Sequence, residues 1–124
     1  MQNNLKKAEK QQVLVVTKAL KKSADYWEIS NKHLGEILGL SEASISRLKN
    51  GNYDLDYNSK QWQLALLFLR AFRGLDAYMG GNSENEKLWL AAHNDALGGA
   101  PFELMKNVEG LSNIVQYIDC MRGQ

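Results

Sequence analysis

The stretch LGEILGLSEASISRLKNG, residues 34–51, decides the fold of this chain. Two helices that cross at a steep angle need a small residue where they touch and a turn that tolerates left-handed backbone. Gly35 meets the first need and Gly39 meets the second. Apolar residues at helical spacing supply the two inner faces, namely Leu34, Leu38, Leu40, Ile45 and Leu48. The stretch therefore predicts a helix-turn-helix.

The second helix of this pair has an outer face suited to the major groove of DNA. Short side chains near its start let the helix end sit deep in the groove, and Arg or Lys further along reach bases or phosphates. Glu42 repels phosphate but can accept a hydrogen bond from cytosine N4. An alternative is a plain αα-hairpin in which Gly39 only ends the first helix. The candidate DNA-binding residues are Ser41, which is placed as the N-cap, Glu42, Ala43, Ser44, Ser46, Arg47 and Lys49.

Helical signals continue on both sides of this motif. Apolar residues from Leu5 to Leu20 recur at helical spacing among lysines, which predicts a basic amphipathic helix. Asn58 or Ser59 can cap a long helix that reaches Tyr78. Because a helix wet on one face shows a single apolar stripe, this long helix is expected to pack on two sides. Its two stripes are Trp62, Ala65, Leu66, Leu69 and Phe72, and Leu64, Leu67, Phe68, Ala71, Leu75 and Tyr78.

Three shorter helices are expected nearer the C-terminus. Ser83 and Glu86 have capping-box spacing, Pro101 fits the first turn of the next helix, and Gly110 separates that helix from the last one. The predicted fold class is all-α, with an N-terminal helix-turn-helix bundle packed on a long central helix and a small C-terminal helical lobe. Residues 1–58 are expected to form the DNA-binding domain, and residues 59–124 the central helix and C-terminal domain.

Composition limits the class of protein further. The 124 residues carry 15 Lys and Arg against 14 Asp and Glu, so the net charge of +1 is too small for a protein that coats nucleic acid. The charge is polarised, because nine of the basic and five of the acidic residues precede Asn52. A single cysteine, a polar start and no long apolar run predict a cytoplasmic protein without a membrane partner.

No catalytic or metal-ligand pattern is present in the sequence. His33, His93 and Cys120 match no ligand spacing, so we expect no metal, no cofactor and no enzyme activity. His33 is expected on a helix surface and His93 in a turn. Trp27, Trp62 and Trp89 are expected in the core. The pairs Lys6/Lys7 and Lys21/Lys22 favour a solvated face, although phosphate contact by the second pair stays open.

Three C-terminal segments carry a family resemblance. FRGLDAYMGG, LWLAAHNDALGGAPFEL and VEGLSNIVQYIDCMRGQ, in this order after the helix-turn-helix, resemble the Xre/MbcA/ParS antitoxins. The resemblance implies a type II antitoxin that represses its own operon and neutralises a RES-domain toxin acting on NAD. His93 stands where the family usually has Pro. The alternative is a plain transcriptional repressor whose C-terminal half only dimerises.

The resemblance also implies where the toxin binds. The last turn, from Asp119 onward, would block the NAD pocket of the toxin, with Tyr117 as an aromatic anchor. The implied toxin-binding residues are Trp89, Asn94, Tyr117, Asp119, Arg122, Gly123 and Gln124. A homodimer on operator DNA is expected because one helix-turn-helix buries too little surface for tight binding. Its interface is expected on the long helix or on the N-terminal helix.

Overall fold

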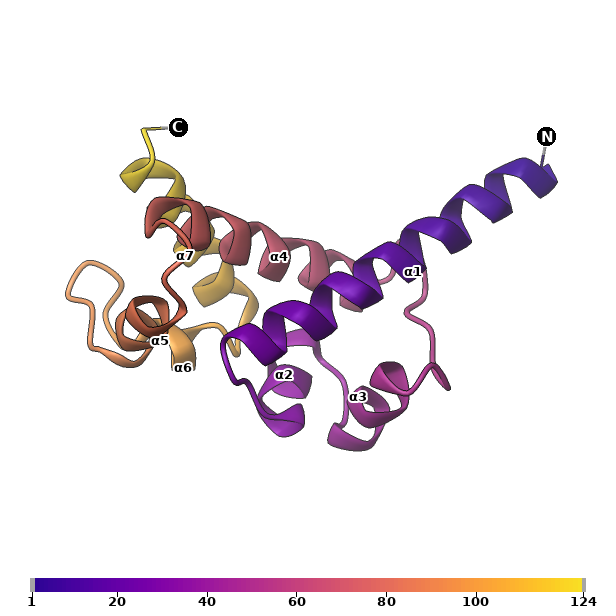
Figure 1. Cartoon of the computed structure of the whole chain (residues 1–124), viewed down its shortest axis with the longest axis horizontal. Helices are drawn as coiled ribbons and strands as arrows, with labels where there is room; N and C mark the ends of the chain where they lie inside the picture. Colours follow the sequence, from indigo (N-terminus) through magenta and orange to yellow (C-terminus); the bar gives the residue numbers. More distant parts are fainter. Residues whose placement is uncertain (1, 124) are drawn as a thin grey trace.

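In the computed structural model, which describes residues 2–123, the chain forms seven helices and no strand (Figure 1). The helices are α1 (Gln2–Tyr26), α2 (Asn31–Leu38), α3 (Glu42–Lys49), α4 (Lys60–Tyr78), α5 (Ser83–Ala91), α6 (Pro101–Leu104) and α7 (Val108–Met121). The predicted all-α fold class is confirmed. The N-terminal part of α1 projects beyond the rest of the molecule, and α5, α6 and α7 gather at the end of α4 remote from it.

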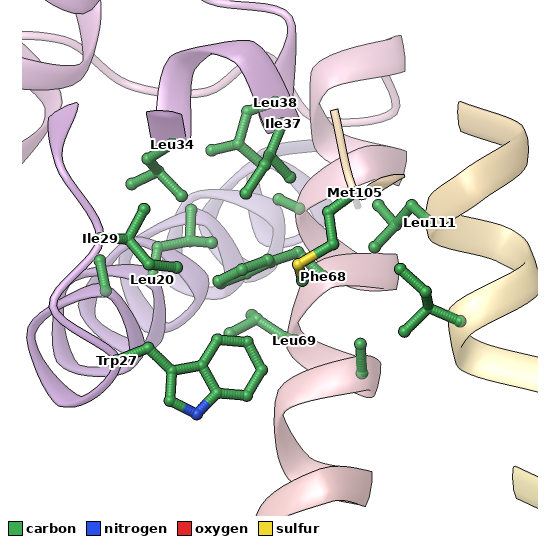
Figure 2. Packing of buried hydrophobic residues seen from close by; sticks show 14 of the residues in the cluster. Leu20, Trp27, Ile29, Leu34, Ile37, Leu38, Phe68, Leu69, Met105 and Leu111 are labelled. Atoms are coloured by element: carbon green, nitrogen blue, oxygen red, sulfur yellow. The ribbon is translucent and has the colours of Figure 1, made fainter. Parts of the chain in front are cut away.

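Helix α4 is the centre of the molecule, packed by α1 and α2 on one side and by α7 on the other. Phe68 is fully buried among residues from several helices, including Leu20 of α1 and Leu111 of α7 (Figure 2). The predicted packing of this helix on two sides is therefore confirmed. Two residues of the predicted stripes, Leu66 and Tyr78, are nevertheless 43% and 51% exposed.

Side-chain caps set most of the helix starts. Ser30, Ser41 and Ser59 accept hydrogen bonds from backbone N–H groups in the first turns of α2, α3 and α4. The predicted cap at Ser83 is one residue late, because Asn82 accepts from the Asn85 N–H at 3.0 Å. Such a bond satisfies a donor that has no partner within the helix.

Gly110 does not separate two helices, as the sequence suggested, but lies in the first turn of α7. A Cβ atom there would stand 2.0 Å from the carbonyl oxygen of Leu104. The glycine therefore permits the close approach of α6 to α7 rather than a break between them. Pro101 occupies the start of α6, as predicted.

Glu86 does not form the predicted capping box but is fully buried between α5 and the end of α1. Its Oε1 accepts a hydrogen bond from Trp27 Nε1 at 3.0 Å. The Tyr26 hydroxyl lies 3.5 Å from Oε2 and donates to the Gly81 carbonyl at 2.8 Å. Burial raises the pKa of Glu86 to about 7, and the nearby Asp76 carboxyl raises it too. Hydrogen bonding to Asp76 raises the pKa of Tyr26 to about 12.

His33 was expected on a helix surface, and this prediction is wrong. The ring is 8% exposed and stacks on Phe102 of α6 with 3.6 Å between ring centroids. Nε2 donates to the Phe102 carbonyl oxygen at 2.8 Å, since a carbonyl can only accept. Burial lowers the pKa of His33, which favours the neutral ring. Lys106 adds an ion pair with Glu36 at 3.1 Å, so α2 is tied to the α6 region.

The raised pKa of Glu86 predicts that the stability of the fold decreases as the pH rises through neutrality. The pKa of Glu86 in the folded protein is about 7, above its ordinary value of 4.5. The contribution of Glu86 to the free energy of unfolding is therefore fully present below pH 4.5 and is lost as the pH rises through 7. The free energy of unfolding of the wild type should fall by about 2.5 kcal/mol between pH 5 and 8, relative to Glu86→Gln. Urea unfolding across this range measures it. Glu84→Gln, on the exposed face of α5, is the control. Parallel profiles for wild type and Glu86→Gln would contradict the raised pKa.

Candidate functional site

The helix-turn-helix has the geometry that its glycines predicted. A Cβ on Gly35 would stand 2.4 Å from the Leu40 carbonyl oxygen, so only glycine allows the two helices this approach. Gly39 ends α2 with φ +74, and its N–H donates to the Gly35 carbonyl. Ile45 and Leu48 of α3 are buried against α2 and α1. The inner face of α3 is thereby fixed, which determines the residues that its outer face presents to solvent.

The outer face of α3 carries a short chain of hydroxyl and guanidinium groups. The Ser41 hydroxyl caps the Ser44 N–H at 3.0 Å and donates to the Ser44 hydroxyl at 2.9 Å. Arg47 Nη2 donates to the same Ser44 oxygen at 3.2 Å. Glu42, Ala43 and Ser46 are exposed next to these hydrogen-bonded side chains. Ser44 and Lys49 are half-buried. The arrangement offers donors and acceptors near the helix N-terminus, where base edges are usually read.

A cationic hollow of about 350 Å³ lies beside α3, between it and α1. Three lysines of α1 and one of α3 line it, and Asp25 is the one carboxylate among the lining residues. Clustered ammonium groups at the side of a recognition helix suit the phosphates that flank a reading site. The sequence signal for this site was the spacing of the α1 lysines, because Lys21 and Lys22 follow Lys18 by about one helical turn. The four lysines are Lys18, Lys21, Lys22 and Lys49.

The C-terminal lobe has a second hollow, of about 270 Å³, on the outer flank of α7. Tyr117 lines it and stacks with Trp89 of α5 at 6.3 Å between ring centroids. Trp89 is half-buried at the edge of the core, whereas Trp27 and Trp62 are buried as predicted. The remaining lining residues were not predicted from the sequence, although three of them recur at helical spacing with Tyr117. These residues are Ala96, Leu97, Asn113, Gln116 and Cys120.

Asn94 and His93 lie in the turn that precedes this hollow. The Asn94 side chain accepts from the Leu97 N–H at 3.1 Å, and its backbone N–H donates to the Gly99 carbonyl at 3.0 Å. Asn94 therefore stabilises this turn through both its side chain and its backbone. His93 is exposed in the turn, as expected, and lies 3.2 Å from Asp95.

The other flank of α7 faces α4 and holds the remaining predicted toxin-binding side chains. Asp119 pairs with Arg70 of α4. The side chain of Arg122 passes over Gly74, where a Cβ would lie 3.8 Å from its Cδ. Gly123 is exposed with φ +77, and Gln124 lies outside the described residues. The structure thus brings Trp89 and Tyr117 together on one flank and directs Asp119 and Arg122 to the opposite flank.

Within residues 2–123, no three His, Cys, Asp or Glu side chains gather in a way that could hold a metal ion. In the same part of the chain, no helix is both long enough and apolar enough to cross a bilayer.

These features define a helix-turn-helix DNA-binding protein joined to a second helical lobe. Comparison with known families places the chain further. Residues 14–70 match the antitoxin Xre-like helix-turn-helix domain, and residues 74–123 match the antitoxin Xre/MbcA/ParS C-terminal toxin-binding domain. The chain therefore belongs to the Xre/MbcA/ParS antitoxin family. No curated protein matches it.

Proposed function

We propose that this protein neutralises a RES-domain toxin that acts on NAD and represses the operon that encodes both proteins. The proposal rests on one observation: the same chain contains a helix-turn-helix with a polar, exposed face on α3 and a lobe that matches a toxin-binding domain. The motifs NDALGGAP and YIDCMRGQ, which resemble those of antitoxins paired with RES toxins, support the choice of toxin. A cytoplasmic, non-enzymatic protein fits this role. Co-expression and co-purification with the product of the adjacent reading frame test it.

A plain repressor is the weaker alternative. Its C-terminal half would serve only to join two subunits, yet residues 74–123 match a toxin-binding domain. The hollow beside Tyr117 also offers a concave surface separate from α3. We therefore retain the division into residues 1–58 for DNA and 59–124 for the central helix and toxin, with α4 beginning directly after the boundary loop.

On the DNA side, two copies bind a palindromic operator through the N-terminal turns of α3. One recognition helix buries too little surface for tight binding, and paired half-sites are the usual solution. In this proposal Ser44 and Arg47 read base edges. The lysines of the α1 hollow contact the flanking phosphates, which fix the position of the protein without reading sequence.

On the toxin side, Tyr117 and Trp89 form an aromatic anchor and the C-terminal tip enters the NAD pocket. Aromatic side chains at the centre of an interface often contribute most of its affinity. An NAD pocket must hold a pyrophosphate and therefore presents cationic and N–H groups. The carbonyls at the end of α7 suit such a pocket. Asp119 needs to leave Arg70 before it can contribute.

The first functional prediction concerns base reading by α3. Arg47→Ala should weaken operator binding by about 1–3 kcal/mol, with the loss confined to one position of each half-site, because a bidentate contact is removed there. Fluorescence anisotropy on the DNA upstream of the gene, with each base pair varied in turn, measures the effect. Unchanged operator affinity in the combined variant Arg47→Ala and Ser44→Glu would remove α3 from the interface.

The second functional prediction concerns the lysine hollow. Lys21→Glu with Lys22→Glu should weaken binding to operator and unrelated DNA alike and lower the slope of log K against log salt by about 1 to 2. Lys6→Glu with Lys7→Glu is the matched control, because it makes the same charge change on the same helix at exposed positions outside the hollow. Equal salt slopes for the two double variants would rule out phosphate contact at the hollow.

The third functional prediction concerns the C-terminal tip. A chain that ends at Asp119 should keep its fold and operator affinity but fail to rescue cells that express the toxin. Arg122→Glu should reduce rescue, and Tyr117→Ala should weaken toxin binding at least about tenfold, equal to about 1.4 kcal/mol. Circular dichroism and operator binding serve as controls for folding. If folded variants protect cells fully, the inhibitory contact lies elsewhere in the lobe.

A further inference from the structure

Helix α5 docks on the rest of the molecule through a carboxylic acid. Its buried residues are Glu86 and Leu90, and Glu86 has no exposed surface. A helix of nine residues is not stable alone in water, because isolated helices shorter than about 12–15 residues are marginal. The docked position of α5 therefore depends on how the Glu86 carboxyl is accommodated.

The Glu86 carboxyl meets hydrogen-bond donors from the end of α1 but no cation. Trp27 Nε1 donates to Oε1 at 3.0 Å. The Tyr26 hydroxyl lies 3.5 Å from Oε2 but donates to the Gly81 carbonyl oxygen at 2.8 Å. Among residues 2–123, no lysine, arginine or histidine forms an ion pair with Glu86. Ionisation of a buried carboxyl without a cation is costly, so the protonated form suits this position best.

Asp76, at the end of α4, brings a second carboxyl group to the same place. Its Oδ1 atom is buried and accepts no hydrogen bond from the part of the chain that the structure describes. Burial raises the pKa of Glu86, and hydrogen bonding to Asp76 raises it further. A hydrogen bond between two carboxyl groups needs a proton on one of them, since two carboxylates have no donor. Two carboxyl groups that face each other cannot both ionise easily, because their charges repel.

The turn between α4 and α5 gives α5 freedom to move. Gly80 and Gly81 have φ angles of +66 and +78. A Cβ atom on either glycine would meet no described atom within 4 Å, so packing does not hold this turn in place. The hydrogen bond from Tyr26 to the Gly81 carbonyl ties the turn to α1. The position of α5 is thus set mainly by its own buried contacts and by this bond.

We propose that Asp76 and Glu86 share one proton, and that this proton holds α5 against the ends of α1 and α4 and releases the helix as the pH rises through neutrality. When the proton passes to solvent, two carboxylates face each other with buried oxygen atoms. Movement of α5 outward about Gly80 and Gly81 separates these charges and hydrates Glu86. Uptake of a proton from solvent reverses the movement.

The release of α5 would reach the C-terminal lobe through Trp89. This side chain belongs to α5 and stacks with Tyr117 of α7 at 6.3 Å between ring centroids. Outward movement of α5 separates the two rings and opens the edge of the hollow beside Tyr117. The effect on toxin binding rests on the proposed function, whereas the shared proton and the movement of α5 do not.

The other charged groups around α5 do not account for such a release. Lys87 pairs with Glu28 of α1 and with Glu84. These ion pairs raise the pKa of Lys87 and lower that of Glu28, so both groups stay charged between about pH 5 and 8. Burial lowers the pKa of His33, whose contribution to stability is therefore lost as the pH falls. A release on rising pH has the sign expected of Glu86 alone among these groups.

Amide hydrogen exchange of the full chain, without DNA or toxin, tests the proposal. The equilibrium constant for opening of α5, corrected for the intrinsic exchange rate, should rise roughly 70-fold between pH 5 and 8. This factor follows from a pKa of about 7 in the docked helix and 4.5 in the released one. The α5 amides should exchange through an opening that leaves the middle of α4 protected.

Three variants separate the shared proton from a general effect of pH. Glu86→Gln should keep α5 docked at both pH values, because an amide can accept from Trp27 and donate to Asp76 without a charge. Asp76→Asn should reduce the rise, since it removes the charge that opposes ionisation of Glu86. Glu84→Gln, which removes a carboxylate from the exposed side of α5, is the matched control and should keep the full rise.

Three results would overturn the proposal. They are equal opening constants for wild-type α5 at pH 5 and 8, an undiminished rise in Glu86→Gln, and exchange of α5 only together with α4. Toxin affinity at the two pH values is measured separately. If α5 opens as described but toxin affinity does not change, the shared proton stands and the role of Trp89 in toxin binding is contradicted.

Discussion

Burial of α4 on two sides is the constraint on which the rest of the structure depends. Its residues supply the core of the helix-turn-helix and the core of the C-terminal lobe at once, so neither part closes without it. A helix that serves one domain shows a single apolar stripe, whereas α4 uses most of its circumference. Helix α3 and the C-terminal lobe are therefore held in one orientation by a shared hydrophobic core.

Polar contacts at the edge of this core add direction to the packing. Trp27 donates to the buried Glu86, and His33 donates to the Phe102 carbonyl. Hydrophobic burial is non-directional, but a buried donor without its acceptor costs about 1–3 kcal/mol. A shifted α5 or α6 would break these bonds and leave the buried groups unpaired. The two lobes thus have one favourable docking geometry rather than a family of similar ones.

Local features of the fold were predictable from sequence, and contacts between distant segments were not. Gly35, Gly39 and the serine caps act within one or two turns of themselves, where a pattern of residues reports directly on geometry. Glu86 and His33 were misread because their partners lie 59 and 69 residues away along the chain. Glu86 has the spacing of a capping box, and only the position of Trp27 reveals that its carboxyl is needed elsewhere.

The same limit applies to the candidate sites. The outer face of α3 followed from the inner face of the same helix, whereas the position of Lys21 and Lys22 beside α3 depended on how α1 crosses α3. The predicted toxin-binding residues of α7 divide between two flanks, because packing on α4 decides which side of α7 remains free. Helix α1 likewise presents different residues to different neighbours, because it packs on both α3 and α4. Its lysines line a hollow with α3, and Val15 and Val16 line another with α4, so the way α1 crosses both helices decides which of its side chains stay accessible.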